Sequence, residues 1–127
     1  MGERRQWPAV VCLTDATRGV VVAQRVKVAS SFLQRLRGLM GRSTLDPGEG
    51  LLIDPCSSVH TFFMRFPIDV LYIGADHVVR RVDHGMRPWR IGPLFTGAVY
   101  VVELPAGTAR ETGVVAGARL SWQPAEN

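Results

Sequence analysis

Hydrophobic and polar residues alternate over several short stretches of the chain. In residues 20–28, Val20, Val22, Val26 and Val28 fall on one parity, whereas Arg25 and Lys27 fall on the other. This period of two is typical of a β-strand with one buried face. Residues 9–13 form a second apolar run, and the polar turn 15–19 separates the two runs. The pattern predicts a β-hairpin.

Further short apolar runs are bounded by glycine, proline and aspartate, which punctuate strands. They predict strands at residues 51–53, 61–64, 68–73, 77–82, 98–104 and 119–123. Trp7 and Trp122 lie near the two ends of the chain, and we expect their rings to pair if the terminal strands are neighbours.

One segment has helical periodicity. Apolar residues recur at the spacing i, i+3, i+4 across residues 29–40, which predicts a helix over residues 31–40 with Ser30 or Ser31 as its cap and Gly41 as its stop. We expect this helix to pack its apolar stripe on the core and to leave Arg35 and Arg37 in solvent. Thr108 and Glu111 fit a capping box and predict one short helical turn.

These elements predict a mainly β (α+β) protein, with a small barrel-like or closed antiparallel sheet, one amphipathic helix and one short helical turn. The 127 residues correspond to one domain, 1–127. Hydrophobic residues make up 46% and charged residues 20%, which is ordinary for a globular protein and excludes a disordered chain.

The net charge of +4 is unevenly distributed. Residues 1–45 carry eight basic and two acidic side chains, a net +6, and the remaining residues carry seven and nine, a net −2. An Arg-rich N-terminal third raises the alternative of a nucleic-acid-associated accessory protein. Because no nucleic-acid-reading motif accompanies the charge, we expect a solvated basic surface and no nucleic-acid partner.

The number of cysteines and the hydropathy of the chain bear on the cellular compartment of the protein. Cys12 and Cys56 are too few for a disulfide framework. The longest apolar runs are far shorter than the roughly 20 residues that span a bilayer. The apolar stretch 8–13 is too short for a signal peptide, and Gln6 does not fit a myristoylation signal. We therefore expect a cytoplasmic protein with no membrane partner.

The densest chemistry lies in residues 55–69, where Cys, Ser, His, Thr, Arg and Asp side chains stand among three phenylalanines. Glu103 ends a very apolar strand further on. We expect a polar–aromatic pocket here that binds a small anionic molecule or an extended peptide, since arginine, imidazole and hydroxyl groups bind anions and aromatic rings supply walls. The candidate ligand-binding residues are His60, Thr61, Arg65, Asp69, Trp89 and Glu103.

Two other interpretations use the same residues. A hydrolase or metalloenzyme would use His60, Asp69, Glu103 and Cys56, with Cys56 or a serine as nucleophile. The spacings typical of metal sites, such as His-x-x-x-His or Cys-x-x-Cys, are missing from the sequence, so we assign no metal ligands and leave the cofactor open. Asp69 also has a purely structural interpretation, as the partner of Arg65 or His60. The set lacks a complete catalytic arrangement, which favours a non-catalytic binding module.

Five blocks in order resemble one family. They are Gly38–Arg42, Gly50–Ile53, Cys56–Asp69, Met86–Trp89 and Glu103–Gly107. Together they resemble the DUF192 family, small prokaryotic proteins of uncharacterised function. The resemblance spans nearly the whole chain and implies a mainly β domain with one packing helix, but no activity, substrate or catalytic residue. Many relatives look exported, and the missing leader favours a cytoplasmic variant.

Overall fold

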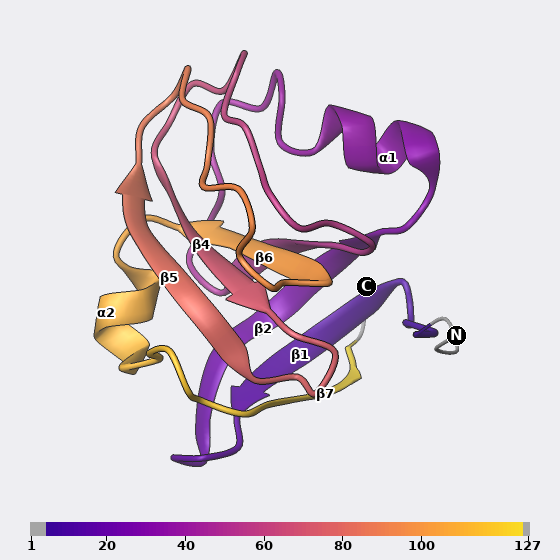
Figure 1. The fold of residues 1–127 in the computed structure, drawn as a ribbon, viewed down its shortest axis with the longest axis vertical. Helices are drawn as coiled ribbons and strands as arrows, with labels where there is room; N and C mark the ends of the chain where they lie inside the picture. The colour runs from indigo at the N-terminus through magenta and orange to yellow at the C-terminus, as the bar shows by residue number, and fades with distance from the viewer. Residues whose placement is uncertain (1–4, 126–127) are drawn as a thin grey trace.

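A single seven-stranded sheet, curled into a half-barrel, organises the protein (Figure 1). The computed structural model describes residues 5–125. The strands are β1 (Val10–Asp15), β2 (Val20–Ala29), β3 (Glu49–Ile53), β4 (Ile68–Ile73), β5 (Val79–Met86), β6 (Tyr100–Pro105) and β7 (Leu120–Pro124). The helices are α1 (Phe32–Arg37) and α2 (Thr108–Thr112). The predicted mainly β class is confirmed.

The strands follow the order β5-β4-β6-β3-β2-β1-β7. Neighbours are antiparallel except β2 and β3, which are parallel, so the fully antiparallel sheet expected from the sequence is wrong at this pair. The reason is the connection through α1, which returns the chain to the end of the sheet where β2 began. An isolated bridge between Val78 and Arg119 joins the segments that lead into the edge strands β5 and β7. This bridge draws the two edges of the sheet together.

The predicted hairpin of β1 and β2 is confirmed. Asp15 builds its turn, because its Oδ1 accepts the backbone N–H of Thr17 at 3.0 Å and its carbonyl accepts that of Gly19 at 2.7 Å. The terminal strands β1 and β7 are paired. As expected from that arrangement, the rings of Trp7 and Trp122 lie 5.0 Å apart between centroids.

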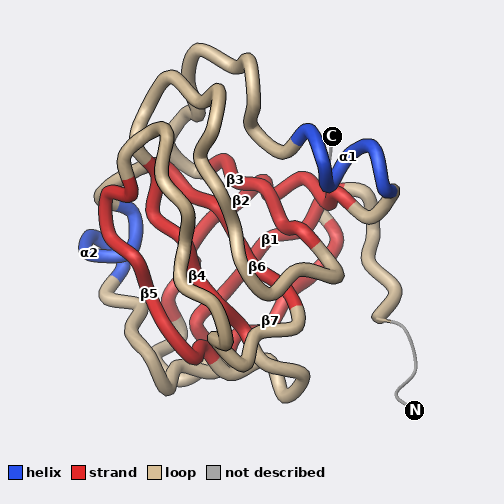
Figure 2. Tube along the Cα trace, turned by 45° about the horizontal axis from the view of Figure 1, so that its top comes forward, coloured by secondary structure: helices blue, strands red, loops and turns tan. Residues whose placement is uncertain are grey.

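The sheet has a hydrophobic core on each face. The first core lies inside the curl, receives side chains from all seven strands, and is closed at one end by α2. The second core lies on the opposite face of β3, β4 and β6, beneath the loops drawn in tan across this face in Figure 2. All six residues of β4 are buried for this reason. Along β4 and β6, therefore, the parity of a residue decides which core it enters.

Helix α1 differs from its prediction in length and in packing. It ends at Gly38, which has a φ of 50°, instead of at Met40. Leu33 and Leu36 are exposed, whereas Ala29, before the helix, and Leu39, beyond it, enter the second core. The start is as expected: Ser31 caps the helix and Gln34 completes a capping box. In the part of the chain that the structure describes, neither helix has the length and hydrophobicity needed to cross a bilayer.

The predicted strand at residues 61–64 is wrong. These residues form turns, and only the neighbouring His60 makes a single bridge, to Ile91. Phe63 adopts a positive φ of 64°, which an extended strand does not permit. The alternation of faces expected along this stretch is therefore replaced by the loop structure described next.

Candidate functional site

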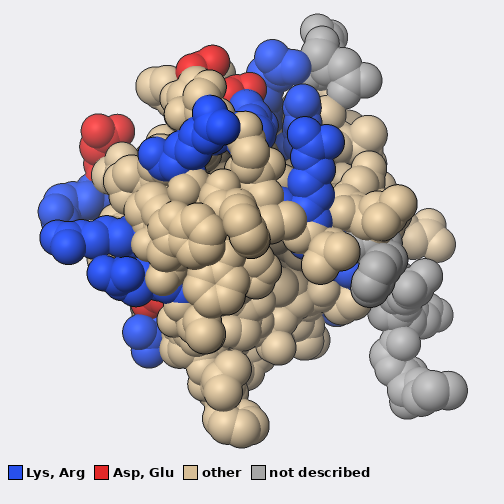
Figure 3. Space-filling model, turned by 90° about the horizontal axis from the view of Figure 1, so that it is seen from above, with Lys and Arg blue, Asp and Glu red and all other residues tan. Residues whose placement is uncertain are grey.

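Two loops, residues 56–64 and 87–97, lie side by side over the second core, and we call them the loop pair. Backbone hydrogen bonds join them: Gly92 N–H donates to the Val59 carbonyl at 2.8 Å, and Thr61 N–H donates to the Arg90 carbonyl at 2.9 Å. The Thr96 hydroxyl donates to the Ser57 carbonyl at 2.7 Å. Figure 3 looks down on this end of the molecule, where basic side chains surround an uncharged centre.

Thr61, a predicted ligand-binding residue, connects the two loops. Its side chain is fully buried, and its hydroxyl donates to the Arg87 carbonyl at 2.6 Å while accepting the Arg90 N–H at 2.9 Å. Both capacities of the hydroxyl are used within the protein. Thr61 therefore positions the loop pair and offers nothing to a ligand.

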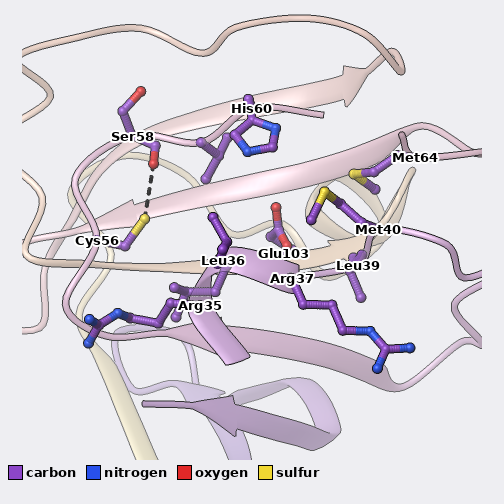
Figure 4. Close-up of a pocket in the computed structure, with 13 residues that line it drawn as sticks. Arg35, Leu36, Arg37, Leu39, Met40, Cys56, Ser58, His60, Met64 and Glu103 are labelled. Carbon is purple, nitrogen blue, oxygen red and sulfur yellow. Dashed lines mark hydrogen bonds between the residues drawn. The ribbon is translucent and has the colours of Figure 1, made fainter. Parts of the chain in front are cut away.

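A small pocket lies between the segment of α1 and the loop pair, above β6 (Figure 4). Its volume is about 70 Å³. Its lining consists of Arg35, Leu36, Arg37, Gly38, Leu39, Met40, Ile53, Cys56, Ser58, Val59, His60, Met64 and Glu103. The structure thus brings His60, Cys56 and Glu103, three residues singled out in the sequence, to one cavity.

Glu103 supplies the floor of the pocket. On β6 it is the partner of Val70 on β4, so its side chain lies on the face of the second core. It is 3% exposed, and burial raises the pKa of its carboxyl to about 8. At neutral pH the carboxyl is mostly protonated, and a protonated carboxyl can donate a hydrogen bond.

His60 stands at the mouth of the pocket and is exposed. Its Nδ1 accepts the backbone N–H of Phe62 at 3.2 Å. In the neutral ring this contact places the remaining proton on Nε2, which becomes a hydrogen-bond donor. The ring also lies 5.0 Å from that of Phe62, which restricts its rotation.

The thiol of Cys56 does not have the features of an activated nucleophile. Its Sγ donates to the Ser58 carbonyl at 3.0 Å, and burial raises its pKa. A reactive cysteine needs a lowered pKa and a nearby base. The candidate base from the sequence, His60, instead uses Nδ1 to accept from the backbone.

Asp69 lies on the other face of the sheet, and its predicted place in the site is wrong. Its neighbour across the strand pair is Leu104, which belongs to the first core, whereas Glu103 belongs to the second face. The predicted pairing with Arg65 or His60 is also wrong, because the Asp69 carboxylate accepts three backbone N–H groups. They are those of Gly85 at 2.8 Å, Gly107 at 3.1 Å and Ala109 at 2.9 Å.

The capping box predicted at Thr108 is wrong, and the contacts of Asp69 show what replaces it. The helix α2 begins after Gly107, and no side chain of its own caps it. Asp69 provides the missing acceptor from β4.

Arg65 and Trp89 lie outside the pocket. Both are exposed, and the Trp89 ring contacts that of Phe63 at 4.8 Å between centroids. They belong to the surface of this end of the molecule and not to the cavity beside Glu103.

The sequence did not identify the contribution of α1 to the site. Arg35 and Arg37 stand on the rim, and their side chains extend in opposite directions in Figure 4. Gly38 lies beside Glu103, since a Cβ there would be 3.9 Å from Glu103 Oε1, and its positive φ of 50° favours glycine at this position. The available signal was the block Gly38–Arg42, one of the five that carry the family resemblance.

The arrangement does not assemble the predicted metal or hydrolase site from His60, Asp69, Glu103 and Cys56, since Asp69 is on the opposite face. Among the described residues, no group of three or more His, Cys, Asp or Glu side chains is placed to hold a metal ion.

The basic residues of the N-terminal third lie in different parts of the structure. Arg5 pairs with Asp54 at 2.7 Å, and Arg18 donates to the Thr112 carbonyl at 3.3 Å. Arg35 and Arg37 border the pocket. Arg25 and Lys27 are exposed elsewhere, so the charge excess counted in the sequence is divided between structural contacts, the pocket rim and other exposed surface.

The curled seven-stranded sheet and two short helices place this protein in the mainly β class. The chain belongs to the DUF192 family, whose model is described as an uncharacterized ACR and matches residues 13–122. The resemblance noted in the sequence is confirmed.

Relatives from thermophilic archaea are named UPF0127 proteins. One from Thermococcus sibiricus is 32% identical over 121 residues, which cover 90% of this chain and 76% of that protein. One from Pyrococcus abyssi is 34% identical over 116 residues, which cover 87% and 96%. Their names assign no activity.

Two solved structures have a similar fold. A Sinorhizobium meliloti protein, provisionally described as a transcription regulator, is 30% identical with a TM-score of 0.78, covering 95% of this chain and 98% of that one. A Novosphingobium aromaticivorans protein of unknown function is 23% identical with a TM-score of 0.75, covering 95% and 94%. The second of these likenesses shows the fold alone.

Proposed function

We propose that the protein is a non-catalytic binding module whose pocket holds the anionic end of a small molecule, with a carboxylate as the preferred group. The observation that supports this most directly is the buried, protonated carboxyl of Glu103 facing a cavity bordered by basic and imidazole side chains. A buried group that is kept neutral can donate to an anion without repelling it.

The pocket offers donors on more than one side. The Glu103 carboxyl supplies an O–H, the His60 ring supplies Nε2–H, and Arg35 and Arg37 add positive charge at the rim. The two oxygens of a carboxylate have enough lone pairs to accept from the floor and the mouth together. Hydrogen bonds to a charged acceptor are stronger than those between neutral groups. A small site, which has room for few contacts, therefore favours a charged ligand group.

The size of the pocket limits the ligand. A water needs a cavity of about 10–15 Å³, so the 70 Å³ here accommodates a group of a few atoms. Leu36, Met40 and Met64 line it and suit the methyl or methylene next to a carboxylate. An extended peptide fits the same site only through its terminal carboxylate.

The test is calorimetric titration of the full chain with sodium acetate, sodium propionate and sodium phosphate at pH 6.5 and pH 9. We expect a carboxylate to bind at pH 6.5 and its affinity to fall at least tenfold at pH 9, where Glu103 is ionised. Glu103→Gln keeps a donor and should bind at both pH values. His60→Gln should weaken binding while leaving its pH dependence in place.

Glu111→Gln is the matched control, since Glu111 is an exposed carboxylate on α2. It should behave like the unaltered protein. Millimolar carboxylate that gives no heat, or binding that is identical in the Glu103 and Glu111 variants, would exclude the proposed site. Binding of phosphate without any carboxylate would reject the preferred group.

A further inference from the structure

The loop pair exposes large apolar side chains that a globular protein usually buries. Five of them have more than half of their surface in solvent: Phe63 at 62%, Trp89 at 56%, Ile91 at 70%, Leu94 at 67% and Phe95 at 100%. Contiguous exposed apolar surface marks an interaction site in soluble proteins. The Phe63 and Trp89 rings contact each other, and the other three side chains follow within six residues of Trp89.

The backbone holds three of these aromatic residues in an unfavourable conformation. Phe63, Trp89 and Phe95 have φ values of 64°, 64° and 58°. Bulky side chains rarely adopt a positive φ, and such strain persists only where the surrounding structure imposes it. The hydrogen bonds of the loop pair impose it here, and they fix the loops in a form that leaves Phe63, Trp89 and Phe95 exposed.

The segments that form this surface carry charge of one sign. Residues 31–44, 55–67 and 84–99 contain no Asp or Glu but six arginines: Arg35, Arg37, Arg42, Arg65, Arg87 and Arg90. Of these six, only Arg42 has a carboxylate within 4 Å, from Glu49, in the described part of the chain. Figure 3 shows this end from above: basic side chains, with a few acidic ones among them, border much of an uncharged centre.

We propose that this end of the molecule docks on an anionic lipid bilayer. The projecting side chains Ile91, Leu94 and Phe95 would enter the boundary between headgroups and acyl chains, while the surrounding arginines pair with lipid phosphates. Arginine stems suit this position because they remain in apolar surroundings while the guanidinium reaches the headgroups. Each basic residue near an anionic leaflet adds to the attraction.

A fluid surface fits these features better than other partners of the same charge. The apolar side chains project from the protein, and a bilayer adapts its shape around them. Bases stack on aromatic rings, so single-stranded nucleic acid would leave Ile91 and Leu94 without a role. The sequence predicted no membrane partner because its apolar runs are too short to span a bilayer and it does not fit a lipid-attachment signal. Neither argument applies to a protein that docks on the surface of a bilayer. The proposal does not rest on carboxylate binding, although Arg35 and Arg37 border both the pocket and this surface.

Sedimentation with vesicles tests the proposal on the full chain. Vesicles of phosphatidylcholine alone are compared with vesicles containing 30% phosphatidylglycerol, at 50 and 500 mM NaCl. We expect binding to the anionic vesicles at 50 mM NaCl, and at least a tenfold loss of affinity in 500 mM NaCl or without phosphatidylglycerol, because salt screens the arginines.

Two double variants, each with a control double variant, separate the contribution of apolar insertion to vesicle binding from that of charge. Leu94→Asp with Phe95→Asp should reduce binding at least tenfold, whereas Val21→Asp with Val115→Asp, also exposed but outside the loop pair, should not. Arg87→Gln with Arg90→Gln should weaken binding more than Arg25→Gln with Arg110→Gln, which removes two exposed arginines elsewhere. Circular dichroism melting verifies that each variant is folded.

Three results would overturn the proposal. One is no sedimentation with anionic vesicles at 50 mM NaCl. The second is binding that the Leu94 and Phe95 substitutions leave unchanged. The third is that these substitutions instead abolish binding of a labelled oligothymidylate or a dimer seen by size-exclusion chromatography, which would assign the surface to nucleic acid or to a second copy of the chain.

Discussion

The carboxylate of Asp69 on β4 accepts the backbone N–H of Ala109 at 2.9 Å, and so caps helix α2 from a strand that lies 40 residues earlier in the chain. The same oxygen accepts from Gly107, and the other oxygen accepts from Gly85. The first N–H groups of a helix have no partner within it. Asp69 therefore joins β4, β5 and α2 at one buried point.

Replacing Asp69 by Ala should destabilise the protein by about 3 kcal/mol, because three backbone N–H groups lose a buried, charged acceptor. Urea unfolding followed by circular dichroism measures this change. Asp76→Ala is the control, since its ion pair with Arg80 is exposed and screened. Equal unfolding midpoints for the two variants would contradict the capping role.

The strands were predictable because their signal is local. Alternation in residues 20–28 and the apolar run 68–73 correspond closely to β2 and β4. The helical stripe was less informative, since an apolar pattern indicates that residues favour burial but not that a surface is available to bury them. Leu33 and Leu36 have the right spacing and remain exposed.

The candidate site was only half predictable for a related reason. His60 and Glu103 were identified by residue type, and the structure brings them to one pocket. Asp69 was assigned to the same site, but the register of β4 on β6 sends it to the opposite face, and register depends on pairing between distant strands. The role of Thr61 depends on hydrogen bonds to Arg87 and Arg90, contacts between distant residues that no local pattern encodes.

The buried carboxyl of Glu103 should make stability depend on pH. Its pKa rises from 4.5 to about 8 on folding, so the folded state binds the proton more tightly than the unfolded state does. Its contribution to the free energy of unfolding is therefore fully present below pH 4.5 and falls as pH rises toward 8, by at most about 1.4 kcal/mol per pH unit.

Glu103→Gln removes this titration. Relative to the unaltered protein, the variant should gain stability steadily between pH 5 and pH 8, as measured by urea midpoints at each pH. The matched variant Glu111→Gln, which changes an exposed carboxylate, should show no such gain. If the urea midpoints of Glu103→Gln and the unaltered protein change in parallel with pH, the Glu103 carboxyl has an ordinary pKa in the folded protein.

The hydroxyl of Thr61 should control the opening of the loop pair. Thr61→Val keeps the shape of the side chain but removes the hydrogen bonds to the Arg87 carbonyl and from the Arg90 N–H. We expect a loss of about 1–3 kcal/mol in stability and faster hydrogen exchange at Trp89 and Arg90. Thr44→Val, at an exposed position, is the control. Unchanged exchange at Arg90 would show that the backbone ladder alone holds the loops.

Trp7 attaches the N-terminal segment to the sheet through Asp54, a buried carboxylate. Trp7 Nε1 and Arg5 Nε donate to the same carboxylate oxygen, at 2.7 and 2.8 Å. Trp7→Phe keeps an aromatic ring beside Trp122 but removes one donor to a buried charge.

We expect Trp7→Phe to lower the free energy of unfolding by about 1.5–3 kcal/mol, the range for a hydrogen bond to a charged group. Trp89→Phe makes the same chemical change at an exposed ring and should alter stability much less, because Trp89 loses no buried hydrogen bond. Guanidinium unfolding of both variants, followed by the fluorescence of the remaining tryptophans, compares them directly. If the two variants unfold at the same midpoint, the Asp54 contact contributes no net stability and only the ring packing holds the segment.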